Sequence, residues 1–286
     1  MVQASPAVEI IKQQAEDALE QVAAHPWFER LARFGYATKG VVYMVVGALA
    51  TLAAVGIGVE TTDTRGALQA IAMRPFGKIL LGIVAIGLVG YVLWRWVQAV
   101  ADVDDKGNSF KGLMVRAGYG LSGLAYAALA LSAAQIILEA RDAARGDRPE
   151  DWTASLMALP YGDLLIGLIG AGVIIFGLFQ IHKGYRAKFR KRLKLTEMSR
   201  TEEPWATLSG RIGYAARGVV FCIVGVFLIQ AARHHNSNEI VGLDGALRKL
   251  AEQNFGPWIL GIVAAGLVAY GIYMLVESRY RRINGS

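Results

Sequence analysis

The chain has 286 residues, of which 54% are hydrophobic and 19% charged, and its mean hydropathy is +0.38. This composition excludes an ordinary soluble domain and a disordered chain, and it favours a membrane protein. The net charge of +7 does not indicate a nucleic-acid partner, because nine of the 30 basic residues fall between Lys183 and Arg211, next to apolar segments. Basic residues in that position are typical of the flanks of membrane spans.

Residues 1–26 are predicted to form an amphipathic helix. The first 24 residues are polar and lack a basic segment followed by an apolar one, so we expect no cleaved signal peptide. Ser5 and Pro6 are typical of a helix start, and His25-Pro26 ends the pattern. The polar face is mainly acidic, which favours packing on the protein itself over adhesion to anionic lipid. The apolar face consists of Val8, Ile11, Ala15, Leu19 and Val22.

Six apolar segments follow, each about 20 residues long, which is enough to cross a hydrocarbon core of about 30 Å. Basic residues are unevenly distributed over the loops that join them, with 21 on one side and nine on the other. Because basic loops stay in the cytoplasm, both termini are predicted to be cytoplasmic. The segments are 36–58, 77–97, 115–138, 161–181, 212–232 and 256–276.

A motif of the form Arg-x-Gly-Tyr-x-x-x-Gly-x-x-(Tyr/Phe) begins at Arg33, Arg116 and Arg211. Such internal repetition at a long period indicates a repeated supersecondary unit, here two membrane helices. Since each unit has an even number of spans, the three units enter the membrane in the same orientation. The predicted fold is therefore all-α, with six transmembrane helices as three parallel two-helix repeats in a pseudo-threefold arrangement. The predicted divisions are the amphipathic helix 1–26 and the repeats 27–105, 106–195 and 196–286.

Small and aromatic residues recur at equivalent positions, and we expect them to pack helices together. Before each second helix, a short helix is predicted at the membrane surface, opened by Asp63, Asp151 or Asp244. The alternative for the aromatic residues is that they line a passage along the threefold axis. The packing positions on the first helices are Tyr36, Gly40, Tyr43, Tyr119, Gly123, Tyr126, Tyr214, Gly218 and Phe221, and those on the second are Gly82, Gly87, Gly167, Gly172, Gly261 and Gly266.

The three copies of the arginine motif, each followed by a second helix with glycines five residues apart, resemble a bacterial membrane family. This family is catalogued as a domain of unknown function, numbered twelve-oh-six, in which a two-helix unit occurs three times. The resemblance covers about Trp27 to Arg282. It implies a six-helix protein of the bacterial inner membrane, and it implies no catalytic or binding residue.

Basic residues near the cytoplasmic ends of the first helices are the candidate binding residues. Burying a charge in a membrane is costly, so each needs a reason. One reason is that these side chains reach out to lipid phosphates. The other is that they converge on a vestibule that attracts an anion or an anionic lipid headgroup. The candidates are Arg33, Lys39, Arg116, Arg211 and Arg217, and a salt bridge between Lys183 and Glu277 is expected nearby.

No motif in the sequence indicates an enzyme, a cofactor or a metal site. The adjacent pair His234-His235 lacks the spacing and the additional ligands that a metal site needs. The expected partners are membrane lipids, including anionic ones. Two classes of function remain: binding or transport of a small molecule, ion or lipid at the threefold bundle, and a non-catalytic membrane scaffold that recruits partners through its basic cytoplasmic loop.

Overall fold

The computed structural model describes residues 25–56, 63–104, 106–107, 109–138, 159, 161–234 and 243–283. The predicted amphipathic helix and the segment around Asp151 lie outside these residues. Among the described residues the fold is all-α, and the only bridge between extended residues joins Leu193 to Arg281. Within these described ranges, six helices are long and apolar enough to cross a membrane, as predicted. They are α2 (Pro26–Ala54), α4 (Gly77–Val100), α5 (Phe110–Ile137), α7 (Gly162–Tyr185), α8 (Glu202–His234) and α10 (Gly256–Tyr280).

The first helix of each repeat begins earlier than its apolar segment. The helix α2 starts at Pro26, where His25 accepts a hydrogen bond from the backbone N–H of Trp27. Glu29 and Arg33 then form an ion pair with a spacing of four residues on the helix surface. The motif arginines therefore lie about two turns inside the helices and do not open them, because the polar first turns continue the helix beyond its apolar part.

The second helices share one backbone conformation at the residue before their first turn. Phe76, Tyr161 and Phe255 each adopt a left-handed conformation, with φ of 61°, 65° and 62°, immediately before a glycine. At the first of these glycines, Gly77, a Cβ atom would lie 2.5 Å from the carbonyl oxygen of Ile71. That oxygen belongs to the short helix α3 (Thr64–Ala72), so glycine is required for the sharp turn from the short helix into the spanning one.

The short helices α3 and α9 (Leu243–Ala251) pack against the spanning helices through one apolar side each. Asp63 caps α3 by accepting a hydrogen bond from the N–H of Gly66 at 2.7 Å. Leu68 of α3 and Leu247 of α9 are fully buried. Each short helix thus covers the end of its helix pair.

The closest helix pairs join one repeat to the next. The second helix of each repeat lies along the first helix of the following one, so that α4 pairs with α5, α7 with α8, and α10 with α2. Two of these pairs share one contact: a Cβ on Gly40 would lie 2.8 Å from the carbonyl oxygen of Gly271, and one on Gly218 2.6 Å from that of Gly177. This cyclic exchange of partners is the pseudo-threefold arrangement.

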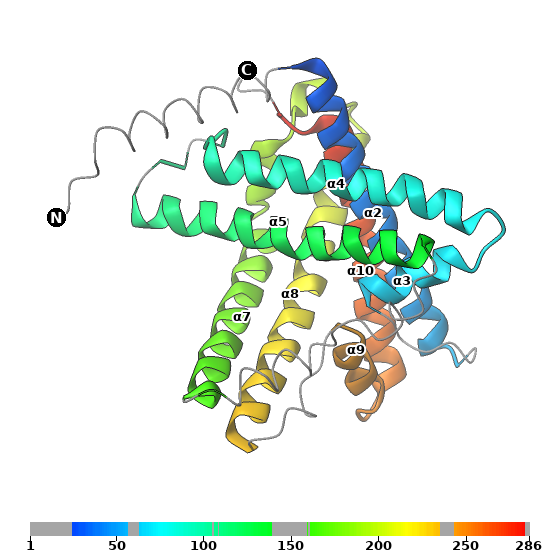
Figure 1. Ribbon diagram of the computed structural model, residues 1–286, viewed down its shortest axis with the longest axis vertical. Coiled ribbons are helices and arrows are strands. Elements are labelled where there is room, and N and C mark those ends of the chain that lie inside the picture. Colours follow the sequence, from blue (N-terminus) through cyan, green and yellow to red (C-terminus); the bar gives the residue numbers. More distant parts are fainter. Residues whose placement is uncertain are drawn as a thin grey trace.

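The third pair differs because Val92 stands where the other second helices have Gly177 and Gly271. Here Gly123 of α5 lies against the indole of Trp96, about one turn further along α4. In Figure 1, the α4–α5 pair runs across the other helices instead of alongside them. Helices of 24 to 33 residues are about 36 to 50 Å long, which exceeds the hydrocarbon core of about 30 Å and allows them to tilt.

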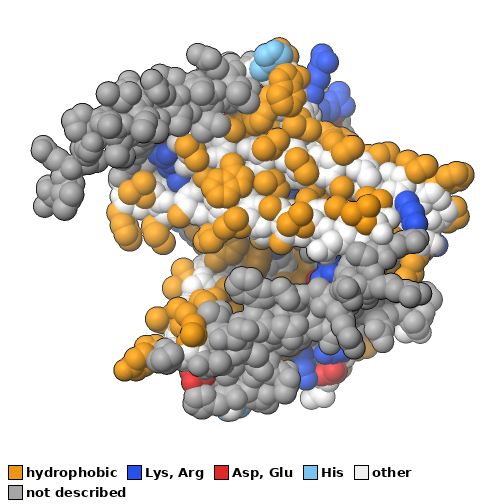
Figure 2. Space-filling model, viewed as in Figure 1, with side chains coloured by type: hydrophobic (Ala, Val, Ile, Leu, Met, Phe, Trp, Pro, Cys, Tyr) orange, Lys and Arg blue, Asp and Glu red, His pale blue; other side chains and the backbone are white. Residues whose placement is uncertain are grey.

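The ring of helices is open on one side. Within the first repeat, Gly35 contacts the backbone of Tyr91, and within the third, Gly213 contacts the backbone of the equivalent Tyr270. The second repeat lacks this contact, since a Cβ on Gly118 of α5 would meet nothing within 4 Å. The spatial order is therefore α5, α4, α2, α10, α8, α7. Figure 2 shows a hollow lined by hydrophobic side chains between α5 and α7.

The second-helix glycines do not all pack closely. At the first predicted packing position of each second helix, a Cβ on Gly82 would meet nothing within 4 Å, and one on Gly167 or Gly261 would lie 3.9 Å from the methyl group of Ala232 or Ala54, an ordinary contact distance. The packing role predicted for Gly82 is wrong, whereas Gly167 and Gly261 face a neighbouring helix that would also accommodate alanine. The next glycine along packs in two repeats, where Gly87 meets Thr38 and Gly266 meets Ala216, whereas Gly172 faces open space. The five-residue spacing rotates successive glycines by about 140°, so they cannot share one neighbour.

Substituting alanine at a close backbone contact should destabilise the protein. We expect Gly218→Ala to cost about 1 to 3 kcal/mol, because the added methyl group overlaps the carbonyl oxygen of Gly177 and forces α7 and α8 apart. The matched control is Gly82→Ala, also within a spanning helix, which should leave stability unchanged or slightly raised. Melting in detergent, followed by tryptophan fluorescence, measures both. Equal melting temperatures for the two variants would contradict the close-contact geometry.

Candidate functional site

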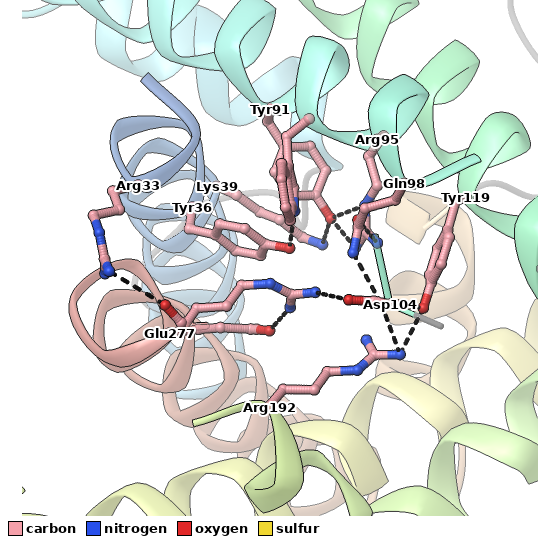
Figure 3. Close-up of polar contacts among 12 residues, drawn as sticks. Arg33, Tyr36, Lys39, Tyr91, Arg95, Gln98, Asp104, Tyr119, Arg192 and Glu277 are labelled. Atoms are coloured by element: carbon pink, nitrogen blue, oxygen red, sulfur yellow. Dashed lines mark hydrogen bonds and ion pairs between the residues drawn. The ribbon is translucent and has the colours of Figure 1, made fainter. Parts of the chain in front are cut away.

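A cluster of charged and tyrosine side chains lies where the three helix pairs cross, toward the end at which α4, α7 and α10 terminate. Figure 3 shows part of this group, which we call the core cluster. It draws its cations from every repeat and from the loop after α7. Its cationic members are Lys39, Arg95, Lys183, Arg192, Arg217 and Arg281, and its carboxylates among the described residues are Asp104 and Glu277.

Lys39 of α2 is held in a cage of tyrosines. Its side chain is only 1% exposed, and its ammonium donates a hydrogen bond to the hydroxyl of Tyr91 at 2.8 Å. The ammonium lies 4.7 Å from the ring centroid of Tyr91, 4.8 Å from that of Tyr126 and 5.5 Å from that of Tyr270. The rings come from α4, α5 and α10. Cation–π contacts of this kind are worth about 2 kcal/mol or more when they are desolvated.

The Tyr91 hydroxyl also accepts hydrogen bonds from Arg95, one turn further along α4. The Nε of Arg95 lies 2.7 Å from that oxygen, and one of its terminal nitrogens contacts it as well. The other terminal nitrogen donates to Gln98, whose amide donates in turn to Asp104 at 3.1 Å. Two cations thus share one neutral hydroxyl oxygen, as Figure 3 shows.

Arg217 of α8 occupies the position in its repeat that Lys39 occupies in the first, while the second repeat has Ser122. Its guanidinium donates to the hydroxyl of Tyr270 at 2.9 Å and lies 5.0 Å from the ring centroid of Phe221. Its Nε is buried and has no hydrogen-bond partner among the described residues. A buried donor left unsatisfied is costly, so it marks a place where a further acceptor would be stabilised.

The two carboxylates lie on one side of the cluster. Arg281 is 1% exposed and sits between Glu277, with which it forms a close ion pair, and Asp104, 3.7 Å away. Asp104 also lies 3.5 Å from Arg192 and accepts a hydrogen bond from the Tyr119 hydroxyl at 2.7 Å. Burial alone would raise the pKa of Asp104, but the guanidiniums of Arg281 and Arg192 outweigh it and lower the pKa to about 2.

The chain after α7 closes over this end of the bundle. It forms two short 3-10 helices, η2 (Lys188–Arg192) and η3 (Leu195–Glu197). Phe189 is fully buried, with its ring centroid 5.4 Å from that of Tyr214 and 4.9 Å from that of Tyr273. The segment is fixed to the C-terminal chain, because the N–H of Lys194 donates to the carbonyl of Tyr280 at 2.8 Å. Part of the basic loop therefore faces the protein interior.

The predicted convergence of the basic residues on one vestibule does not include the three motif arginines. Arg33 donates to the carbonyls of Ser278 and Arg281, at the end of α10. Arg116 donates to the carbonyls of Ala99 and Val100, at the end of α4. Arginine there satisfies carbonyls that a helix end leaves unpaired, which explains the position of Arg33 and Arg116 in the motif. Arg211 is exposed on α8. Of the five predicted binding residues, only Lys39 and Arg217 join the core cluster.

The motif tyrosines and their equivalents fill the axis at the level of Lys39. The ring centroids of Tyr91 and Tyr126 are 4.7 Å apart, and those of Tyr43 and Tyr270 are 4.8 Å apart. Phe221 instead packs on Phe176 of α7, at 5.1 Å. The remaining motif positions, Tyr36, Tyr119 and Tyr214, are buried as well.

Sequence reasoning missed most of the cluster outside α2 and α8. The expected salt bridge between Lys183 and Glu277 is not formed, because Lys183 donates to the Tyr214 hydroxyl at 2.8 Å while Glu277 pairs with Arg281. Arg95, Arg192 and Asp104 carried no repeated signal, since the repeats differ at these positions. Only their position near the ends of the second helices could have indicated them. His235 of the histidine pair lies outside the described residues.

One protein-family model matches three separate segments of the chain. The family model described as Domain of Unknown Function (DUF1206) matches residues 34–102, 117–187 and 212–281. The chain belongs to this family. DUF1206 matches thus fall once in each predicted repeat. The chain is also 37% identical over 258 residues to "Uncharacterized protein YxxB" of Bacillus subtilis (strain 168), an alignment covering 90% of this chain and 93% of that protein. No solved structure matches.

The ion pairs of Asp104 predict a dependence of stability on pH. Its pKa of about 2 lies below the ordinary value of 3.8, so the ionised carboxylate stabilises the fold. This contribution, about 2 kcal/mol from the size of the shift, is present above the ordinary value and is lost as the pH falls toward 2. We therefore expect Asp104→Asn to lower the melting temperature in detergent at pH 7, with the deficit shrinking between pH 4 and pH 2. A deficit that is the same at every pH would contradict the ion-pair role.

Proposed function

We propose that this protein binds a small anion or an anionic lipid headgroup at the core cluster, as a multi-pass protein of the bacterial plasma membrane, and that it acts by binding or transport and not by catalysis. The observation that carries the proposal is the excess of cations in the cluster, where six basic side chains face two carboxylates.

An excess of like charge in a buried site must be compensated. Removing a charged side chain from water costs several kcal/mol, and repulsion between neighbouring cations adds to that cost. The tyrosine hydroxyls and rings supply dipoles and quadrupoles, which reduce the cost but carry no net charge. A bound anion would neutralise part of the excess, and the unpaired Nε of Arg217 offers it a hydrogen-bond donor.

The donors favour an oxyanion. A guanidinium can bind the two oxygens of a carboxylate, sulfate or phosphate in parallel, whereas a spherical ion gains only from the charge. The same chemistry fits a free anion and the phosphate of a lipid headgroup, and the hollow between α5 and α7 would give lipid a lateral approach. The two sources have to be separated by experiment.

Binding is tested by thermal shift of the purified protein in nanodiscs. Chloride, nitrate, sulfate and acetate test free anions, in nanodiscs made of neutral lipid. Phosphatidylglycerol replaces part of that lipid to test headgroups. We expect an oxyanion or the anionic lipid to raise the melting temperature, and Arg217→Gln to reduce the rise at least several-fold.

The control is Arg248→Gln, which removes one exposed positive charge from α9, a helix that contributes no residue to the core cluster. It should leave the anion-dependent shift unchanged. If Arg248→Gln and Arg217→Gln alter the shift equally, or if neither anions nor anionic lipid shift the parent protein, the proposed function is wrong.

The uneven distribution of basic residues supports cytoplasmic termini and a cytoplasmic position for the segment between α7 and α8. Single cysteines at the exposed positions Thr201→Cys and Asn254→Cys, each in a Cys222→Ser background, test this orientation. In intact cells, a membrane-impermeant thiol reagent should label the cysteine at position 254 and leave the one at position 201 unlabelled until the cells are lysed. The reverse labelling would invert the topology.

A second candidate function, recruitment of a protein partner, is favoured by a groove on the same end of the bundle. The groove has a volume of about 490 Å³, and three of its six lining residues, Arg190, Lys191 and Arg282, are basic. Under this alternative, Lys191→Gln with Arg282→Gln would abolish capture of an acidic partner. These substitutions should leave the anion-dependent thermal shift unchanged, which separates the two functions.

A further inference from the structure

The cations of the core cluster differ in whether they can lose their charge. Four are arginines, which keep their proton at all physiological pH values. The other two, Lys39 and Lys183, can become neutral amines. Lys183 is only half-buried, whereas Lys39 is enclosed by rings from three other helices. If the core cluster loses one positive charge, Lys39 is therefore the residue that we expect to lose it.

The groups that face Lys39 contain little negative charge. Tyr43 lies on its own helix, and hydroxyls or guanidiniums face it from α4, α5, α8 and α10. Among the described residues, no carboxylate lies within ion-pair distance of its ammonium. The more distant Glu277 is already paired with Arg281. The facing groups are Tyr43, Tyr91, Arg95, Tyr126, Arg217, Tyr270 and, further away, Lys183 and Glu277.

The hydrogen bond between Lys39 and Tyr91 can exist in two directions. As an ammonium, Lys39 donates to the Tyr91 oxygen, which also receives two N–H groups of Arg95. This oxygen has two lone pairs, so three donors exceed its capacity, and its own proton faces an ammonium. If Lys39 releases a proton, its amine accepts the Tyr91 O–H across the same 2.8 Å distance while Arg95 continues to donate. The loss of one charge therefore requires no movement of the heavy atoms.

We propose that Lys39 is a proton-binding residue that couples anion binding at the core cluster to the uptake of a proton. With an anion bound, Lys39 is an ammonium and the added charge is compensated. Without it, Lys39 releases its proton to solvent and the excess positive charge falls by one. A proton and a monovalent anion that bind and leave together carry no net charge, which is the balance expected of a proton-coupled anion carrier. This inference rests on the proposed function.

The test counts protons taken up when the anion binds. The full-length protein in nanodiscs is titrated calorimetrically with whichever of chloride, nitrate, sulfate and acetate stabilises it most. Two buffers that differ in ionisation enthalpy are used at the same pH. The difference between the two binding enthalpies gives the number of protons, which we expect to be close to one, and affinity should fall about tenfold per pH unit where Lys39 is neutral in the empty protein.

The decisive variant is Lys39→Arg, which keeps the positive charge but cannot release it. The equivalent residue of the third repeat is Arg217, so arginine is accommodated at this position of the repeat. We expect this variant to bind the anion with proton uptake near zero. Lys39→Met, neutral and of similar length, should bind more weakly and also without proton uptake, and it serves if the arginine variant does not fold. Lys183→Arg tests the other lysine of the cluster. The matched control is Lys111→Arg, exposed on α5 and outside the cluster, which should retain the uptake.

Each outcome decides between the proposals. Anion binding without proton uptake in the parent protein overturns the role of Lys39 and leaves the proposed function intact. Loss of uptake in Lys183→Arg but not in Lys39→Arg moves the proton to the other lysine and overturns the assignment. If none of the four anions binds the parent protein, the role of Lys39 is overturned, and the proposed function fails as well when phosphatidylglycerol also leaves the melting temperature unchanged.

Discussion

The fold depends on the direct approach of helix backbones at paired glycines. In lipid no hydrophobic effect draws helices together, so close packing and polar contacts must hold them. Gly40 against Gly271 and Gly218 against Gly177 supply the close packing at equivalent places in two of the three inter-repeat pairs. Their effect is to fix α7 and α10 to the first helix of the following repeat, which helps to bring residues of all three repeats to one crossing point. The core cluster exists because of this exchange of partners.

Tyrosine is the common partner of the cations at that crossing point. Lys39, Arg95, Lys183, Arg192 and Arg217 each donate to a tyrosine hydroxyl, and of these five only Arg192 is within ion-pair distance of a carboxylate in the described part of the chain. A tyrosine offers both a ring face and a hydroxyl oxygen, so it can satisfy the hydrogen bonds of a cation without cancelling its charge. A site built in this way keeps a positive field, whereas one built from carboxylates would be neutral.

Sequence patterns were sufficient for the helices and the repeat, because apolar length and periodic small residues report directly on burial in lipid. They were insufficient for the site. Arg33 and Arg116 satisfy the terminal carbonyls of α10 and α4, so their recurrence reflects capping and not a ligand, whereas the third copy, Arg211, is exposed. Conversely, Arg95, Asp104 and Arg192 meet only through tertiary contacts between segments that do not repeat. The closing segment after α7 was likewise hidden, because a run of basic residues looks the same whether it faces water or a tyrosine-lined interior.

Among the described residues, the second repeat lacks the glycine contact that joins α2 to α4 and α8 to α10, and this gives the molecule a distinct front and back within the plane of the bilayer. If the two helices of every repeat were in the same contact, the three sides of the bundle that face lipid would be equivalent. Here α2 is joined to α4, and α8 to α10, by a glycine that contacts the backbone of Tyr91 or Tyr270. The equivalent glycine of α5, Gly118, makes no such contact. The same repeat carries Ser122 in place of a cation, so the open flank is also the one that contributes least charge at the level of Lys39. Divergence of a single copy thus turns a threefold assembly of identical units into a polarised one with one preferred side.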